Sequence, residues 1–320
     1  MPDFESSYPL QKDDMLAIEN TLYEVLKEEL VARQFLPLNT SFEPFAAEIG
    51  YDWYDITGSA KILAAGASAN DIPFVGEKGG REVMKVYDIL TGIKYTKAER
   101  QASQAKAALG KGPACSLDVV RVATARRFIA ETENRIAFVG DAKHKIKGLL
   151  NHPGVTSAQV AQGIKGTTAA EKRLWVNKTP QEILEDIRIG KGTVEKKNIF
   201  KARVLVITPG QYNILLRPYS DMSPMTVLSW LQSQGQFFEQ IVVASELSKE
   251  NNGFETGGVK EDCFAILDNR REIIELALVQ DLEMGDPVYD IIGTSSQSVG
   301  MRTAGPIIRH PAAIYVARGC

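Results

Sequence analysis

The sequence contains little of what enzymes, disulfide-rich domains and metalloproteins require. Three histidines and three cysteines occur in 320 residues, and the cysteines form no CxxC pair, which excludes a disulfide scaffold and argues against a zinc site. No GxSxG, HExxH or GxxxxGK[ST] motif is present. We therefore predict no catalytic residue, no cofactor, no metal and no enzymatic activity, and expect Cys115, Cys263 and Cys320 to be small buried or terminal thiols.

Long apolar runs and a strong charge of one sign are also missing. The run Ile273–Val279 is interrupted by Glu275 and is far too short to span a bilayer. Lys and Arg total 37 against 40 Asp and Glu, a net charge of −3, which argues against a basic nucleic-acid binder. The acidic N-terminus does not resemble a secretory signal. We expect a soluble protein of about two domains, made inside the cell, with no membrane contact.

An amphipathic helix is predicted over residues 13–32, because apolar residues recur there at spacings of three and four. Nothing nearby in the sequence offers this helix a partner. Its own domain and a neighbouring subunit both remain open as the surface that it contacts.

Two strands are predicted next, at 48–63 and 83–95, joined by a glycine-rich stretch. The apolar phase changes near Trp53, which predicts a β-bulge or a strong twist there. A lone hairpin is marginally stable in water, so its apolar face indicates packing between subunits. The residues expected at such contacts, including two from the N-terminal helix, are Leu22, Leu26, Trp53, Tyr54, Ile62, Ile72, Phe74, Val83 and Tyr87.

A long helix is predicted over 116–139, ending at Gly140. From Thr179 the pattern becomes mixed α/β, and TPQE predicts a capping box with Thr179 as N-cap. The glycine clusters at 76–81, 110–113 and 189–193 fit no phosphate-binding loop and are interpreted as turns. The basic run at 191–203 is interpreted as a solvated face.

The stretch ENRIAFVGDAKHKIKGLLNHPGV at 133–155 resembles the major capsid proteins of tailed bacteriophages, in which a spine helix ends in a tight turn before a GLLN element. The matching positions at the helix end and turn are Phe138, Gly140, Asp141, Gly148, Leu149, Leu150 and Asn151. The segments at 179–187, 204–216, 226–231 and 304–319 resemble the later elements of that family in the same order.

The resemblance implies an α+β protein with the Hong Kong 97-like phage capsid fold. Its parts would be an N-terminal arm (1–47), an extended hairpin loop (48–97), a peripheral domain (98–178 and 286–320) with the spine helix at 116–139, and an apical α/β domain (179–285). The implied function is self-assembly into pentamers and hexamers of an icosahedral shell enclosing double-stranded DNA, held without sequence specificity.

The implied location is the virion capsid, with synthesis in the host bacterial cytoplasm. Scaffolding, portal and cement proteins are further candidate partners. An encapsulin-type nanocompartment, which shares this fold but encloses enzymes, remains an alternative. A small-molecule α/β enzyme is the alternative from another class and is disfavoured by the missing motifs.

Overall fold

A computed structural model describes residues 30–62, 73–108, 117–196, 198–220, 223–233, 237–256 and 259–320. The chain forms two compact units. The larger unit contains residues 29–90, 129–283 and 300–320, and the described part of the smaller unit is 91–108, 117–128 and 284–299. The helix predicted at 13–32 lies almost wholly outside the described residues, which begin with a short helix, α1 (Ala32–Phe35).

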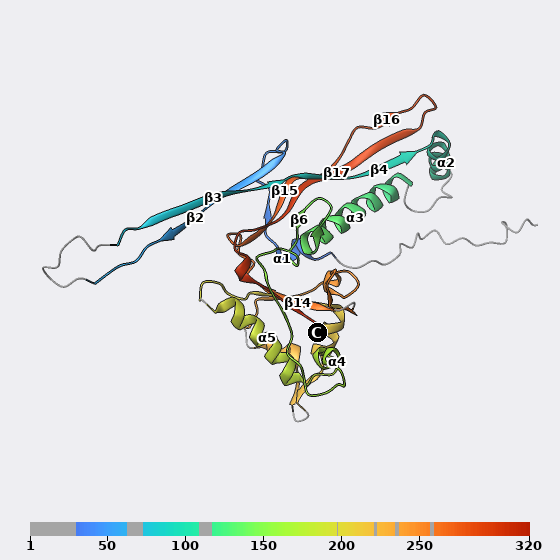
Figure 1. The fold of residues 1–320 in the computed structure, drawn as a ribbon. Coiled ribbons are helices and arrows are strands. Elements are labelled where there is room, and N and C mark those ends of the chain that lie inside the picture. The colour runs from blue at the N-terminus through green and yellow to red at the C-terminus, as the bar shows by residue number, and fades with distance from the viewer. Residues whose placement is uncertain are drawn as a thin grey trace, which may run out of the picture. The chain divides into compact units, whose positions relative to one another are not determined.

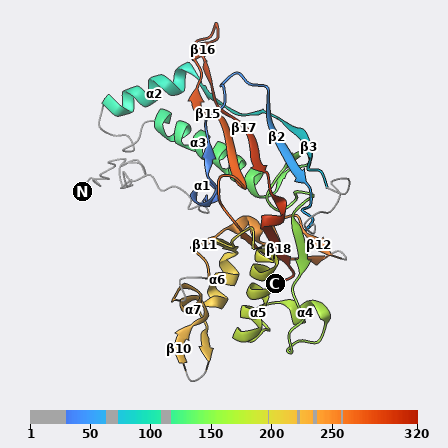
Figure 2. The same cartoon turned by 90° about the vertical axis from the view of Figure 1, so that its left-hand side faces the viewer.

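A five-stranded sheet in the larger unit has the order β11-β8-β14-β18-β7. Figure 1 labels β14 of this sheet, and Figure 2 labels β11 and β18. Its strands are β7 (Thr156–Gln159), β8 (Val204–Ile207), β11 (Gln240–Val243), β14 (Cys263–Leu267) and β18 (Ile314–Arg318). β8 and β14 are buried throughout, as continuous apolar runs require. Residues 314–318 pair with β14 on one side and with β7 on the other, and these ladders satisfy their backbone hydrogen bonds.

Helix α5 (Pro180–Glu195) packs on β14 and β18 of this sheet. The predicted capping box is confirmed: the Glu182 amide donates to Thr179 Oγ1 at 3.4 Å, and the Thr179 amide donates to the Glu182 carboxylate at 2.7 Å. The glycine cluster at 189–193 is helical and not a turn, so that prediction is wrong. A Cβ on Gly190 would lie 2.8 Å from Ile266, so glycine permits close packing of helix on sheet.

Smaller elements complete the surroundings of this sheet. The helices are α4 (Ala169–Arg173), α6 (Pro209–Leu215) and α7 (Val227–Ser233), with 3₁₀ turns at Ser245–Leu247 and Pro311–Ala313. The two short hairpins are β9 (Pro218–Ser220) with β10 (Ser223–Thr226), and β12 (Glu255–Thr256) with β13 (Val259–Lys260).

The extended hairpin consists of β2 (Glu48–Thr57) and β3 (Gly76–Lys85), drawn as a long ribbon in Figure 1. Its register runs without interruption from Glu48 opposite Lys85 to Thr57 opposite Gly76, so the predicted bulge is absent from these strands. The apolar phase can change without a bulge because the distal ribbon is exposed on both faces. The predicted turn at 76–81 is also wrong, because its three glycines lie in β3, opposite Trp53, Tyr54 and Thr57.

The second strand of the predicted hairpin divides after Lys85. Residues 87–95 form β4 (Tyr87–Tyr95), which pairs with β17 (Ser295–Ile308) in another sheet. That sheet has the order β1-β15-β17-β16, and its remaining strands are β1 (Leu38–Asn39), β15 (Ile274–Met284) and β16 (Val288–Tyr289). The ribbon is therefore shorter than predicted, and its root joins a buried core.

The predicted spine helix is α3 (Leu117–Phe138), and α2 (Lys97–Ala108) precedes it. In the larger unit, α3 is tied to α1 by buried polar groups. The Ala32 amide donates to Asn134 Oδ1 at 2.9 Å, and Arg33 pairs with Glu133 at 2.9 Å. No described helix is long and apolar enough to cross a membrane.

Candidate assembly surfaces

The distal hairpin carries several exposed apolar side chains. Alternation places Tyr54, Ile56 and Val83 on one face of the ribbon, and we call this set the outer hairpin face. The three side chains are 77%, 60% and 52% exposed. Asp52 and Arg81 lie on the same face and form a two-bond ion pair at 2.6 and 2.9 Å, which lowers the pKa of Asp52 below its usual value.

The opposite face of the ribbon turns toward the subunit's own core at its root. Ile49 is buried against residues of β15 and β17. Further out, the Trp53 ring lies on Gly80, where an added Cβ would be 2.8 Å from the ring. Glycine at 80 therefore lets the indole lie flat across the neighbouring strand.

The residues predicted at subunit contacts fall into three groups. Leu22, Leu26 and Ile72 lie outside the described residues. Trp53, Tyr54, Ile62, Phe74 and Val83 are exposed, with 99% for Ile62 and 89% for Phe74. Tyr87 is half-buried, and its hydroxyl donates to the His144 carbonyl at 2.7 Å. Their role in assembly stays a prediction.

The turn after the spine helix is built from glycine and a side-chain amide. Gly140 has φ +74°, the left-handed value that its predicted capping role requires. A Cβ on Gly148 would lie 2.4 Å from the Gly140 nitrogen, so the two segments touch through backbone alone. Asn151 Oδ1 accepts from the Gly148 amide at 2.6 Å.

The same turn returns the chain to the core. The amides of Leu149 and Leu150 donate to the carbonyls of Ala137 and Phe138 at 2.9 and 2.8 Å, and both leucines are buried with Phe138. The strands β5 (Gly140–Asp141) and β6 (Ile146–Lys147) form a small hairpin in between. Asp141 accepts from the His144 ring at 2.7 Å and from the Lys143 amide at 2.9 Å, and these bonds lower its pKa. Phe138, Gly140, Asp141, Gly148, Leu149, Leu150 and Asn151 are thus brought together by the structure.

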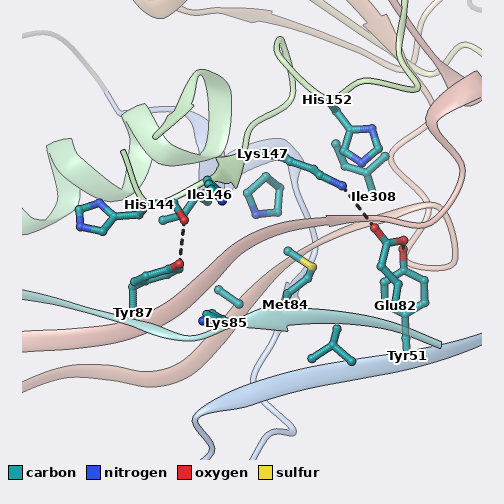
Figure 3. A pocket seen from close by; sticks show the side chains of 14 residues that line it. Tyr51, Glu82, Met84, Lys85, Tyr87, His144, Ile146, Lys147, His152 and Ile308 are labelled. Carbon is teal, nitrogen blue, oxygen red and sulfur yellow. Dashed lines mark hydrogen bonds and ion pairs between the residues drawn. The ribbon is translucent and has the colours of Figure 1, made fainter. Parts of the chain in front are cut away.

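The hairpin root is attached to this turn by two bridges, visible in Figure 3. One is the hydrogen bond from Tyr87 to His144, and the other joins Lys147 Nζ to Glu82 Oε1 at 3.4 Å. The Tyr51 hydroxyl donates to Glu82 at 2.5 Å. This bond and Lys147 together lower the pKa of Glu82, while burial and the nearby carboxylate raise the pKa of Tyr51.

The smaller unit carries an exposed apolar loop that our sequence analysis missed. Ile291 and Ile292 are 102% and 77% exposed, at a turn closed by the Gly293 amide donating to the Asp290 carbonyl at 2.8 Å. The signal available in the sequence was the pair of isoleucines inside the turn-like segment DIIG at 290–293. In the same unit, Arg121 pairs with Glu99 at 3.0 Å.

The described residues hold no cluster of three or more His, Cys, Asp or Glu side chains that could bind a metal. Cys263 and Cys320 are free and buried, as predicted, whereas Cys115 lies outside the described residues. Burial raises the pKa of Cys263 to about 12, which disfavours the reactive thiolate.

Comparison with known proteins identifies the family. A sequence model described as Major capsid protein matches residues 58–319. Comparison with curated proteins gives no significant match.

Solved structures show the fold. The capsid of Myoviridae phage XM1 matches with a TM-score of 0.78 and 11% identity over 97% of this chain and 99% of that one. The capsid of the native GTA particle gives 0.63 and 12%, covering 98% and 97% of the two chains. A virus-like particle from Pyrococcus furiosus gives 0.56 and 15%, covering 89% and 90%. The predicted Hong Kong 97-like capsid fold is confirmed, and with most of its length matched by the family model the chain belongs to the major capsid protein family, as a shell-forming structural protein.

Proposed function

We propose that this protein is the subunit of a virion shell, which closes as pentamers and hexamers into an icosahedral container for double-stranded DNA. The observation that carries the proposal is the outer hairpin face together with Ile62 and Phe74. These side chains are exposed in the single chain, and exposed apolar surface of this kind marks a contact with another protein.

Assembly works through packing. Tyr54, Ile56 and Val83 would lie over a neighbouring copy and lose their exposure, while the hairpin root stays fixed in its own core through Ile49. Obligate assemblies bury large apolar areas of this kind. Each contact need only be weak, because every subunit makes several at once.

The roles proposed for the parts of the chain follow the arrangement that is typical of the family. Residues 1–47 would act as an arm on a neighbour, the spine helix and turn as the rigid support, and the region built around 179–285 as the lobe at capsomer centres. The intact turn at Gly140 and Gly148 supports this assignment, because it fixes the helix end with backbone contacts that tolerate no side chain.

Contact with the packaged DNA would be electrostatic and independent of sequence. The net charge of −3 favours a lining on which DNA slides, because a strongly basic surface would hold it. Scaffolding, portal and cement proteins are the further partners of such a shell. We assign the protein no enzymatic activity, and place its synthesis in the cytoplasm of a bacterial host.

An encapsulin-type compartment is the second candidate, favoured by the likeness to the virus-like particle from Pyrococcus furiosus. Native particles purified after nuclease treatment separate the two. Protected double-stranded DNA of a constant length supports the virion shell. A co-purifying enzyme with no protected DNA supports the compartment and overturns the first proposal.

A further inference from the structure

A cavity of about 350 Å³ separates the root of the hairpin from the turn that follows the spine helix (Figure 3). Residues of β2, β3 and β4 line one side, residues of the turn together with His152 line the opposite side, and β17 contributes the rest of the lining. The two bridges described above cross this space. Because side chains do not fill the cavity, packing cannot replace a bridge that is lost.

The two bridges lie at opposite ends of the cavity. Tyr87 and His144 meet at one end, and Glu82, Lys147 and His152 lie at the other (Figure 3). Lys147 Nζ is 3.4 Å from Glu82 Oε1, and both charges act on the imidazole of His152. This end therefore combines a carboxylate, an ammonium group and an imidazole that can gain a charge.

The surroundings of His152 fit the neutral imidazole. The side chain is half-buried, and its Nδ1 accepts from the Gly154 amide at 3.3 Å, which leaves the hydrogen on Nε2. A second proton would occupy Nδ1 and set one N–H group against another. It would also place a second positive charge beside Lys147. Burial and the Lys147 ammonium accordingly lower the pKa of His152, and the opposing effect of Glu82 is smaller.

His152 is the group at this end whose charge changes below pH 6.5, the usual pKa of histidine. The pKa of Glu82 is held below its usual 4.5, chiefly by the Tyr51 hydroxyl, whereas burial raises the pKa of Tyr51. The His144 ring lies at the far end, bonded to Asp141 at 2.7 Å. The other charged or titratable side chains that line the cavity or directly follow β17 are Lys85, Tyr87, Lys145, Arg309 and His310.

We propose that the root of the hairpin is a joint that acid opens: it is closed while His152 is neutral, and it opens when this imidazole takes up a proton. Opening separates the charged ring from Lys147 and gives it access to water. Because the closed joint binds the proton more weakly than the open one, proton uptake favours the open form. The closed form is thus fully stable above pH 6.5 and loses stability as the pH falls through the lowered pKa of His152.

Glu82 adds a second step in the same direction. Its pKa is lowered, so the ionised carboxylate stabilises the closed joint fully above pH 4.5, and this stabilisation is lost as the pH falls through the lowered value. Protonation of Glu82 removes its ion pair with Lys147. Opening is a property of the single subunit and needs no shell, whereas an effect of opening on assembly rests on the proposed function.

The test is hydrogen–deuterium exchange of full-length, unassembled subunits, measured by mass spectrometry at about pH 7.5 and about pH 5.5 and corrected for the intrinsic rate of exchange. We expect residues 82–87 and 144–147 to lose protection at the lower pH, while the core strand β14 keeps it. His152→Gln keeps an acceptor for the Gly154 amide but cannot become charged, so this variant should show no loss at either segment. His310→Gln removes a histidine outside the cavity lining and, as the matched control, should respond like the parent.

The titration of His152 in the parent chain supplies an independent readout. NMR of histidine-labelled subunits gives its midpoint, which should coincide with the midpoint of opening. Equal protection of the two segments at both pH values, a loss that persists in His152→Gln, or midpoints more than about one pH unit apart would overturn the proposal. Equal loss in β14 would also overturn it, because the whole subunit would then be unfolding. Failure of the proposed shell would appear as an absence of particles and would leave these subunit measurements unchanged.

Discussion

Replacement of Ile62 by serine tests whether the hairpin tip drives assembly. The side chain is 99% exposed in the single chain, so its removal takes nothing from the subunit's own core. Full burial of an isoleucine against a neighbour contributes about 1.5–3 kcal/mol. Loss of that contribution raises the critical concentration for assembly roughly 10- to 100-fold.

The assay is static light scattering of purified subunits over a series of concentrations, together with thermal unfolding of the unassembled subunit. Ala60→Ser is the matched control, because it introduces the same hydroxyl at an exposed position two residues earlier. We expect Ile62→Ser to leave the free energy of unfolding within about 0.5 kcal/mol of the parent. An unchanged critical concentration in Ile62→Ser, or an equal rise in Ala60→Ser, would refute the reasoning.

Three further predictions concern the fold that supports these surfaces. Gly190→Ala should destabilise the subunit by about 1–2 kcal/mol, because its Cβ would meet β14 and β18 at 2.8–2.9 Å. Gly192→Ala, in the same helix but with open space around it, should raise the free energy of unfolding by about 0.5–1 kcal/mol. Denaturant titration of the two variants measures both effects. Equal effects at the two sites would contradict the packing of α5. Thr179→Ala should lower the free energy of unfolding by about 1 kcal/mol, because the helix loses its N-cap. An unchanged free energy of unfolding would show that the cap does not contribute to stability. Hydrogen bonds from Arg121 and Thr96 lower the pKa of Glu99 from 4.5 to about 2. The ionised Glu99 therefore stabilises the folded subunit fully above pH 4.5, and this stabilisation is lost as the pH falls toward 2. Glu99→Gln should weaken the dependence of the melting temperature on pH within that window. An unchanged dependence would exclude a stabilising role for Glu99.

Local chemistry made part of the fold predictable from the sequence. The long helix predicted over 116–139 is observed as Leu117–Phe138, because the signals that begin and end a helix lie within its own sequence. The start of α5 at Thr179 and the left-handed Gly140 were predicted for the same kind of reason, since caps depend on neighbours in the sequence.

Tertiary packing decided the features that the sequence misassigned. Gly80 lies in a strand where an indole covers it, and Gly190 lies in a helix that packs against a sheet, so neither position has room for a Cβ. Neither partner is close in sequence, so glycine content alone predicted turns. The missed loop around Ile291 and Ile292 has the opposite cause, because isolated apolar doublets are common and only the structure shows this one to be uncovered.

The most direct test of the central claim is a cryo-electron microscopy reconstruction of native particles containing this chain. We predict a closed icosahedral shell in which Tyr54, Ile56 and Val83 of each hairpin are buried against a neighbouring copy. A shell in which this face remains open to solvent would contradict the assigned role of the hairpin. A particle with no repeating copies of this chain in its wall would contradict the account as a whole.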